Sequence, residues 1–136
     1  MRCRGIRGAT TATANTAEAI LSATRELLTL LVERNAVAVD EVVSVFFTVT
    51  DDLDAQHPAL AARQLGWHDA ALLCAREIPV PGSLGRCIRV LLHVNTELSA
   101  SEMRHVYLRE AVALRPNRAD PLAPSPNGHS LGGQAK

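Results

Sequence analysis

The stretch CIRVLLHVNT (Cys87–Thr96) carries the strongest β-strand signal in this chain of 136 residues. Successive side chains of a strand point to opposite faces, so alternation separates two sets of residues. One face holds four aliphatic residues, Ile88, Val90, Leu92 and Val94. The other face holds Cys87, Arg89, Leu91 and His93. The pattern predicts a strand over Cys87–Val94 with an apolar face toward the core and an arginine on the opposite face.

Other segments share the β-branched and aromatic composition that is typical of strands. In Val42–Thr50 the residues Val43, Val45, Phe47 and Val49 alternate with others. Strands are predicted at Arg4–Thr11, Val42–Thr50 and Ala70–Ala75, the last one buried, and extended segments at His105–Leu108 and Ala111–Leu114.

One segment has the apolar periodicity of a long helix, and two further segments carry helix-boundary signals. Apolar residues recur at helical spacing from Ile20 to Leu31, which predicts a long amphipathic helix that ends near Arg34. Asn15, followed three residues later by Glu18, has the form of its N-terminal cap. His57-Pro58 opens a short helix that Gly66 closes, and Ser99 with Glu102 predicts a capped helical turn.

Strands outnumber helices, so the predicted fold class is α+β. A single long helix can cover only one face of the sheet. The other face then needs a neighbouring subunit, which predicts an oligomer.

Length and composition limit the function classes. A chain of 136 residues predicts one domain, here residues 1–116, followed by a Pro- and Gly-rich tail at 117–136 that is expected to be disordered. Zero net charge and 3% aromatic residues argue against nucleic-acid binding. No apolar run has membrane-spanning length and no signal peptide is visible, so a cytoplasmic location without membrane attachment is expected.

The three cysteines are widely spaced, and their spacing matches neither a disulfide framework nor a metal site. Cys3 and Cys87 are expected to be small buried hydrophobic residues. No metal or cofactor is predicted.

Arginine supplies 13 of the 14 basic residues, which codon bias in a GC-rich genome largely explains. Arg7, Arg89 and Arg115 nevertheless stand at strand positions or before a proline, where full solvation is not expected. A buried guanidinium costs several kcal/mol, on the order of magnitude, unless an anion pairs with it. That anion is either Glu77 within the fold or a small di-anionic substrate held by several guanidinium groups.

Five separated motifs are similar, in order and approximate spacing, to those of the AroH-type chorismate mutases. The similarity extends from Arg4 to Arg115. The motifs are RGIRGATT (Arg4–Thr11), the block Cys74 to Glu77, CIRV (Cys87–Val90), RHVYL (Arg104–Leu108) and LRP (Leu114–Pro116).

The resemblance implies a mixed five-stranded sheet with a long helix, assembled as a pseudo-barrel homotrimer with active sites between subunits. The implied activity is the Claisen rearrangement of chorismate to prephenate, on the route to phenylalanine and tyrosine. That reaction requires no cofactor.

The resemblance also assigns roles at matching positions. Arg7 resembles the arginine that binds a substrate carboxylate, and Arg89 the arginine that reaches a carboxylate and the ether oxygen. Glu77 and Cys74 resemble the pair near the ring hydroxyl. Tyr107 resembles the tyrosine on the pyruvyl side, although a strand aromatic at this position could instead fill the core.

Further positions would complete the cleft. Arg115 matches a residue of the C-terminal lid, and Arg63 a charged residue at the cleft mouth. Leu72 and Leu73 would form an apolar wall. His57 stands where the family often has phenylalanine and Leu60 where it often has lysine, so the rim of the cleft departs from the family pattern.

Two alternatives are a RidA-type imine deaminase, whose trimers also place an arginine between subunits, and a non-catalytic trimer that binds a metabolite. This sequence lacks the motif pattern that is characteristic of the imine deaminases. The second would bind chorismate without consuming it.

Overall fold

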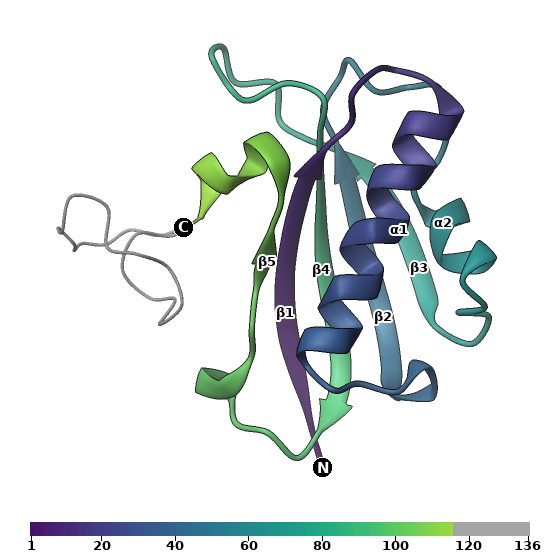
Figure 1. The fold of residues 1–136 in the computed structure, drawn as a ribbon, viewed down its shortest axis with the longest axis vertical. Helices are drawn as coiled ribbons and strands as arrows, with labels where there is room; N and C mark the ends of the chain where they lie inside the picture. Colours follow the sequence, from purple (N-terminus) through teal and green to yellow (C-terminus); the bar gives the residue numbers. More distant parts are fainter. Residues whose placement is uncertain (116–136) are drawn as a thin grey trace, which may run out of the picture.

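The computed structural model describes residues 1–115, which form a five-stranded sheet with two α-helices (Figure 1). The strand order is β3-β2-β4-β1-β5. Strand β4 pairs antiparallel with β1 and β2, whereas the β1–β5 and β2–β3 pairs are parallel, so the sheet is mixed. The elements are β1 (Arg2–Thr11), α1 (Ala17–Arg34), β2 (Val42–Val49), α2 (Ala59–Gln64), β3 (Ala71–Arg76), β4 (Cys87–Thr96) and β5 (Val106–Tyr107). The predicted α+β class and mixed sheet are confirmed. The predicted tail, 117–136, lies outside the described residues.

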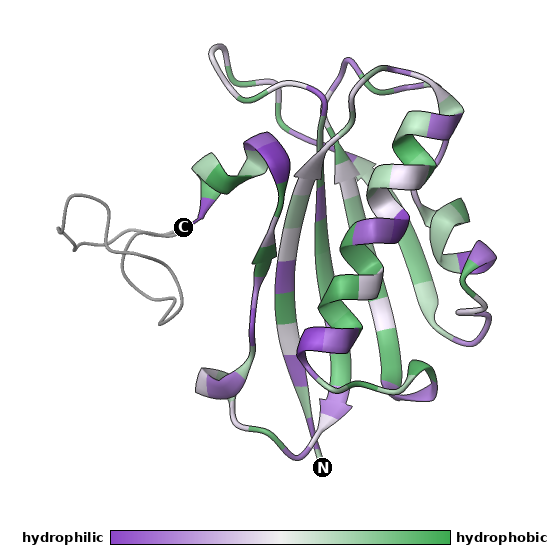
Figure 2. Ribbon diagram, in the orientation of Figure 1, coloured by the Kyte–Doolittle hydropathy of each residue, from purple (hydrophilic) through white to green (hydrophobic). Residues whose placement is uncertain are grey.

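The core lies between α1 and one face of the sheet. The four aliphatic residues of β4 that were predicted to share a face are at most 3% exposed. Val90, Leu92 and Val94 pack in one cluster with Leu27, Leu28 and Leu31 of α1, and Ile88 packs in a second cluster with Ile20 and Ala23 of the same helix. Figure 2 shows apolar and hydrophilic residues alternating along α1 where it crosses the strands. Each fully buried leucine of this kind contributes about 1.5–3 kcal/mol. This core is what fixes the register of the strands.

Gly8 permits a close approach of α1 to β1. A Cβ atom at this position would lie 2.9 Å from Cδ1 of Leu31 and 3.1 Å from Cδ1 of Leu27. Since protein interiors are close-packed, a side chain here would force those leucines to move. Gly8 therefore sets the spacing between helix and sheet directly behind the position of Arg7.

The predicted cap of α1 was wrong by one residue. Thr16 has an extended backbone, and its hydroxyl accepts a hydrogen bond from the amide of Ala19. Asn15 instead binds the loop after β2: its Oδ1 accepts from the amides of Asp54 and Ala55. The pairing of Asn15 across 39 residues is a tertiary contact that a local capping pattern does not reveal.

The strand predicted at Val42–Thr50 is confirmed as β2, with one irregularity that the alternation did not indicate, and one other strand prediction needs correction. A register shift between Val42 and Ser44 turns Val43 outward, where it is 43% exposed, because the irregularity adds a residue to β2. Strand β3 was predicted to be buried but lies at the edge of the sheet, and its Leu73 is 57% exposed. Apolar composition alone did not distinguish a core strand from an edge strand whose outer face is uncovered.

The predicted extended segment Ala111–Leu114 is wrong, because residues Arg109–Leu114 form a 3₁₀-helix, η3. Arg109 has φ 54°, which turns the chain away from β5. Ala111 then donates its amide to the carbonyl of Leu108 and is fully buried. By contrast, the capped turn at Ser99 and Glu102 is present as the 3₁₀-helix η2, Ala100–Glu102.

Of the two cysteines that were expected to be buried, one is buried and the other is exposed. Cys87 is buried, as expected, and burial raises the pKa of its thiol to about 11. Cys3 is exposed, because it is the second residue of β1 and lies at the end of the strand whose first four residues are exposed or half-buried. The expectation of a buried Cys3 was wrong.

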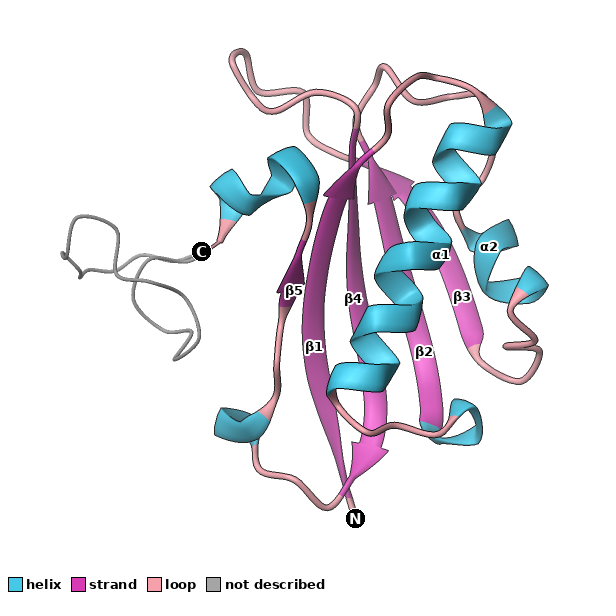
Figure 3. Cartoon of the chain, viewed as in Figure 1, coloured by secondary structure: helices cyan, strands magenta, loops and turns pink. Residues whose placement is uncertain are grey.

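Both α-helices lie on the same side of the sheet (Figure 3). The opposite side, which we call the outer face, presents large apolar side chains to solvent in the single chain: Phe46 at 47%, Leu73 at 57% and Leu91 at 36% exposure. Apolar patches of this kind on a sheet usually mark contact with another protein surface. Within residues 1–115, no helix has both the length and the apolar character needed to cross a bilayer.

Candidate functional site

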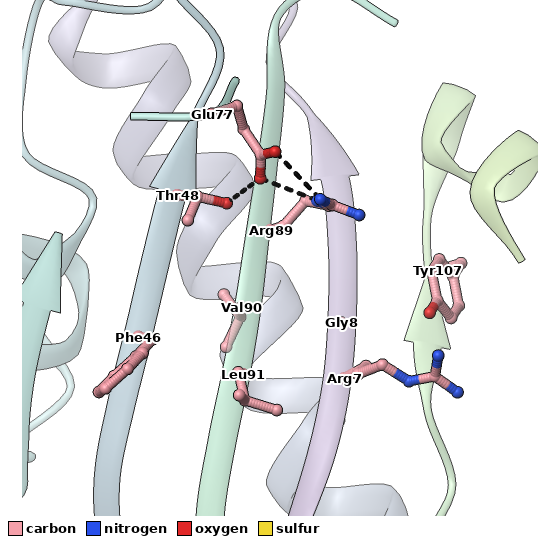
Figure 4. A pocket seen from close by; sticks show the side chains of 9 residues that line it. All are labelled: Arg7, Gly8, Phe46, Thr48, Glu77, Arg89, Val90, Leu91 and Tyr107. Atoms are coloured by element: carbon pink, nitrogen blue, oxygen red, sulfur yellow. Dashed lines mark hydrogen bonds and ion pairs between the residues drawn. The ribbon is translucent and has the colours of Figure 1, made fainter. Parts of the chain in front are cut away.

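The charged residues of the outer face gather around a cavity of about 310 Å³, which we call the arginine pocket (Figure 4). Its polar lining consists of two guanidinium groups, a carboxylate, a phenol and a hydroxyl, and the remainder is apolar. The nine lining residues are Arg7, Gly8, Phe46, Thr48, Glu77, Arg89, Val90, Leu91 and Tyr107. The cavity has the size and the mixed lining of a site for a small ligand.

Strand register explains why Arg7 and Arg89 share this pocket. Ala9 pairs with Arg89 across β1 and β4, and Arg7 lies two residues before Ala9. A two-residue offset keeps a side chain on the same face, so both arginines project from the outer face. Thr48 of β2 is the partner of Arg89 on the other side. The pocket is thus built on three adjacent strands of a rigid sheet.

Arg89 and Glu77 form a bidentate ion pair at one end of the pocket. Nε of Arg89 lies 2.8 Å from Oε2 of Glu77, and Nη2 lies 3.0 Å from Oε1. The hydroxyl of Thr48 also donates to Oε2 of Glu77. The hydrogen bond from Arg89 holds the pKa of the Glu77 carboxyl below its usual range, although partial burial opposes this, and the pKa of Arg89 is raised by the same bond. Both groups therefore stay charged at neutral pH.

Of the two explanations for Arg89 that the sequence left open, the internal partner Glu77 is confirmed. Glu77 is its internal partner, yet the Arg89 side chain remains 53% exposed. In the described residues its Nη1 has no hydrogen-bond partner, although the group carries five N–H donors in all. Arg7 is half-buried and has no carboxylate partner in the described part of the chain. Within residues 1–115, Arg89 therefore keeps donors that Glu77 does not use, and no carboxylate pairs with Arg7.

Tyr107 belongs to the pocket and does not fill the core. The core position of β5 is taken by Val106, which is fully buried. Tyr107 points to the opposite side of the same short strand and is half-buried there. Figure 4 shows its ring on the strand beyond Arg7, with Glu77 and Arg89 toward the other end of the pocket.

A second cavity, of about 410 Å³, lies beside α2 and the edge strand β3, and we call it the thiol pocket. His57 and Cys74 line it. Partial burial raises the pKa of the Cys74 thiol, and the charge of nearby Arg63 opposes this rise. Among residues 1–115, no three His, Cys, Asp or Glu side chains gather in a metal-binding arrangement.

The structure thus divides the predicted site residues into two groups. Arg7, Glu77, Arg89 and Tyr107 share the arginine pocket, whereas His57 and Cys74 line the thiol pocket, with Arg63 acting on Cys74. The side chain of Leu72 packs against the core, and that of Leu73 lies exposed on the outer face. Arg115, the last described residue, lines neither cavity.

Five of the nine residues that line the arginine pocket were not predicted as site residues from the sequence: Gly8, Phe46, Thr48, Val90 and Leu91. Phe46 and Thr48 lie between the alternating apolar residues of β2, so the apolar pattern does not indicate them as site residues. Only the strand register, which places them opposite Leu91 and Arg89, reveals their part in the pocket. Leu114 lines a smaller cavity of about 190 Å³ that adjoins Glu77 and Arg89, and only the 3₁₀-helix brings it there.

The fold and the pocket define an α+β protein with a small cavity on the open face of its sheet, lined by two arginines. The sequence matches the family described as chorismate mutase type I over residues 3–118, and the chain belongs to that family. It is 56% identical to the chorismate mutase AroH of Thermus thermophilus over 115 residues, which is 84% of this chain and 94% of the relative. It is 43% identical to the chorismate mutase AroH of Bacillus subtilis (strain 168) over 118 residues, 86% of this chain and 93% of the relative.

The fold of this chain is also similar to that of a solved structure. The chorismate mutase from Clostridium thermocellum superimposes with a TM-score of 0.80 at 51% sequence identity, over 81% of this chain and 98% of that one. The predicted resemblance to AroH-type chorismate mutases is confirmed. The imine deaminase and the non-catalytic binding trimer receive no support from these comparisons.

Proposed function

We propose that this chain converts chorismate to prephenate in the arginine pocket, with no cofactor or metal. The observation that carries the proposal is the placement of Arg7 and Arg89 on adjacent strands around one cavity, with a carboxylate and a phenol beside them. Chorismate carries two carboxylates, and guanidinium groups bind carboxylates through paired hydrogen bonds. The spare donors of Arg89, and the guanidinium of Arg7, which has no carboxylate partner within residues 1–115, suit a dianion of this size.

The Claisen rearrangement needs neither a nucleophile nor a proton transfer. The protein can lower the barrier in two ways: it can hold the flexible substrate in its reactive chair, and it can stabilise the charge that separates as the C–O bond breaks. Fixed charges suit the second task because they need little reorganisation in the transition state. The Arg89–Glu77–Thr48 network supplies such fixed charges.

Each residue then has a distinct role. Arg7 binds a carboxylate, and Arg89 directs Nη1 toward the ether oxygen, where negative charge grows. Glu77, which stays ionised, favours the positive character that develops on the ring. Tyr107 closes the side that receives the pyruvyl group.

The thiol pocket can form one active site with the arginine pocket only if it belongs to a neighbouring chain of an oligomer. His57, Cys74 and Arg63 line or influence a separate cavity, and the apolar outer face is uncovered in the single chain. A homotrimer that buries the outer face would bring the arginine pocket of one chain against the thiol pocket of the next. Arg63 would then stand at the mouth, with Leu72 and Leu73 forming the apolar wall and Arg115 contributing to a lid.

The direct test of the proposed function is incubation of the purified protein with chorismate. Chorismate absorbance should fall, and prephenate should appear in equal amount. The buffer should contain a metal chelator, and no cofactor should be added. A chain that binds chorismate but leaves it unchanged would contradict the proposal.

The lowered pKa of Glu77 in its ion pair with Arg89 predicts how activity depends on pH. Because the pKa of Glu77 is lowered from its ordinary value of 4.5, the carboxylate stays ionised as the pH falls through that value. The contribution of the pair is therefore fully present above the ordinary pKa and is lost only as the pH falls through the lower, folded-state pKa. We expect kcat to stay constant from pH 8 to about 5.

The variant Glu77→Gln keeps the shape of the side chain and removes its charge. We expect kcat to fall about 10²-fold at pH 7, because one fixed charge of the transition-state environment is lost. The fall at low pH that remains in wild type should be absent from this variant. An acid limb that is identical in both proteins would show that a different group titrates.

The cytoplasmic location and the domain boundary at residue 116 remain predictions. Cell fractionation with an antibody to the chain tests the first. Truncation after residue 116, followed by the chorismate assay, tests the second.

A further inference from the structure

We propose that His105 is a positioning residue that holds the substrate-binding strand at Arg7 through its imidazole Nδ1. This inference rests on the proposed role of Arg7. The backbone amide of Arg7 donates a hydrogen bond to Nδ1 of His105 over 2.9 Å, between residues 98 positions apart. Only an unprotonated nitrogen can accept it, so the structure assigns the neutral imidazole with its proton on Nε2.

The contact matters because β5 is very short. Only two residues of β5 pair with β1: Val106 with Gly8, and Tyr107 with Ala9. A parallel pair of this length has few backbone hydrogen bonds to hold it in place. The imidazole of His105 adds one more bond at the next residue of β1, which is Arg7 itself. It thereby ties the strand of Tyr107 to the strand of Arg7.

The other side of the same segment is held by Asn35, which is 2% exposed. Its Nδ2 donates to the carbonyls of Leu31 and Arg104, and its Oδ1 accepts from the amide of Arg104 over 2.7 Å. Residue 104 is thus fixed to the end of α1, and residue 105 to β1. Two side chains together position the segment that leads into Tyr107.

Loss of the His105 acceptor should therefore loosen the spacing between the Arg7 guanidinium and the Tyr107 ring. Displacement of a substrate-positioning group by about 1 Å can cost about 10²-fold in rate. Because Arg7 would bind a carboxylate in both the ground state and the transition state, KM should carry most of the change. His105 itself lines neither of the two pockets.

Two amide variants form a matched pair for the test. In His105→Asn, Oδ1 stands about where Nδ1 stood, so the acceptor is kept. In His105→Gln the same group lies one bond farther from the backbone and misses the Arg7 amide. We expect His105→Asn to keep kcat/KM within about threefold of wild type, and His105→Gln to lose about tenfold to a hundredfold, mainly in KM. His68→Ala, at an exposed loop position, serves as the unrelated histidine control.

Equal kcat/KM in the Asn and Gln variants would overturn the proposal, provided that both fold and assemble as wild type does. A second measurement needs no variant to fold well: imidazole ¹⁵N–¹H spectra of the wild-type protein at neutral pH. They should show the proton of His105 on Nε2, and a proton on Nδ1 would overturn the assignment. If wild type fails to convert chorismate, the proposed function falls, whereas active wild type with an unaffected His105→Gln refutes this inference alone.

Discussion

Replacing Arg89 by lysine is expected to lower kcat for chorismate by a factor of about 10²–10³ while KM changes much less. Lysine keeps the positive charge but presents it at a single nitrogen. In wild type, Nε and Nη2 bind Glu77 and leave Nη1 for the substrate. An ammonium group cannot pair with both carboxylate oxygens of Glu77 and also reach the ether oxygen in a fixed direction.

The measurement is a full kinetic profile at neutral pH, with Arg34→Lys as the control. Arg34 lies exposed in the last turn of α1, on the helix side of the sheet, so its replacement should leave both constants near wild type. If Arg89→Lys retained wild-type turnover, a general positive charge would suffice and the directed Nη1 contact would have no role.

The second large effect is the recovery of activity when two impaired variants are mixed. Arg89→Ala removes the transition-state charge from the arginine pocket. Arg63→Glu reverses the charge beside the thiol pocket, where like-charge repulsion of a dianionic substrate costs several kcal/mol, on the order of magnitude. Each pure variant should therefore be at least about tenfold less active than wild type.

Random assembly of equal amounts of the two chains has a defined outcome if the site lies between copies. A site then has an intact Arg89 side in half of the cases and an intact Arg63 side in half of the cases. About one quarter of all sites should be fully active, whatever the number of chains in a closed ring. The mixture should thus recover about a quarter of wild-type activity after joint refolding or co-expression.

The outcome distinguishes two arrangements of the site. Recovery to about a quarter requires that residues from different chains form one site. An activity equal to the mean of the two pure variants would place the whole site within a single chain and contradict the shared-cleft proposal. Light scattering on the same samples should give three times the mass of one chain.

Local sequence patterns predicted the central elements well. The alternation over β4 and the helical spacing over α1 were confirmed because both depend on the period of the backbone itself. Arg89 was singled out because a guanidinium in an apolar strand needs a partner, and it has one in Glu77. The segments that failed were those whose conformation depends on distant contacts, such as Ala111–Leu114, where Arg109 turns the chain into a 3₁₀-helix.

By itself the sequence determined which face of each central strand is apolar, the position of the long helix and the likeness to one enzyme family. Only the tertiary structure decided that Arg7 and Arg89 share a pocket, that Cys74 and His57 line a different one, and that His105 holds the Arg7 amide. The physical reason is that side-chain direction follows from local backbone geometry. Contacts between residues as far apart as Arg7 and His105 depend instead on strand order and register, which the packing of the whole core sets.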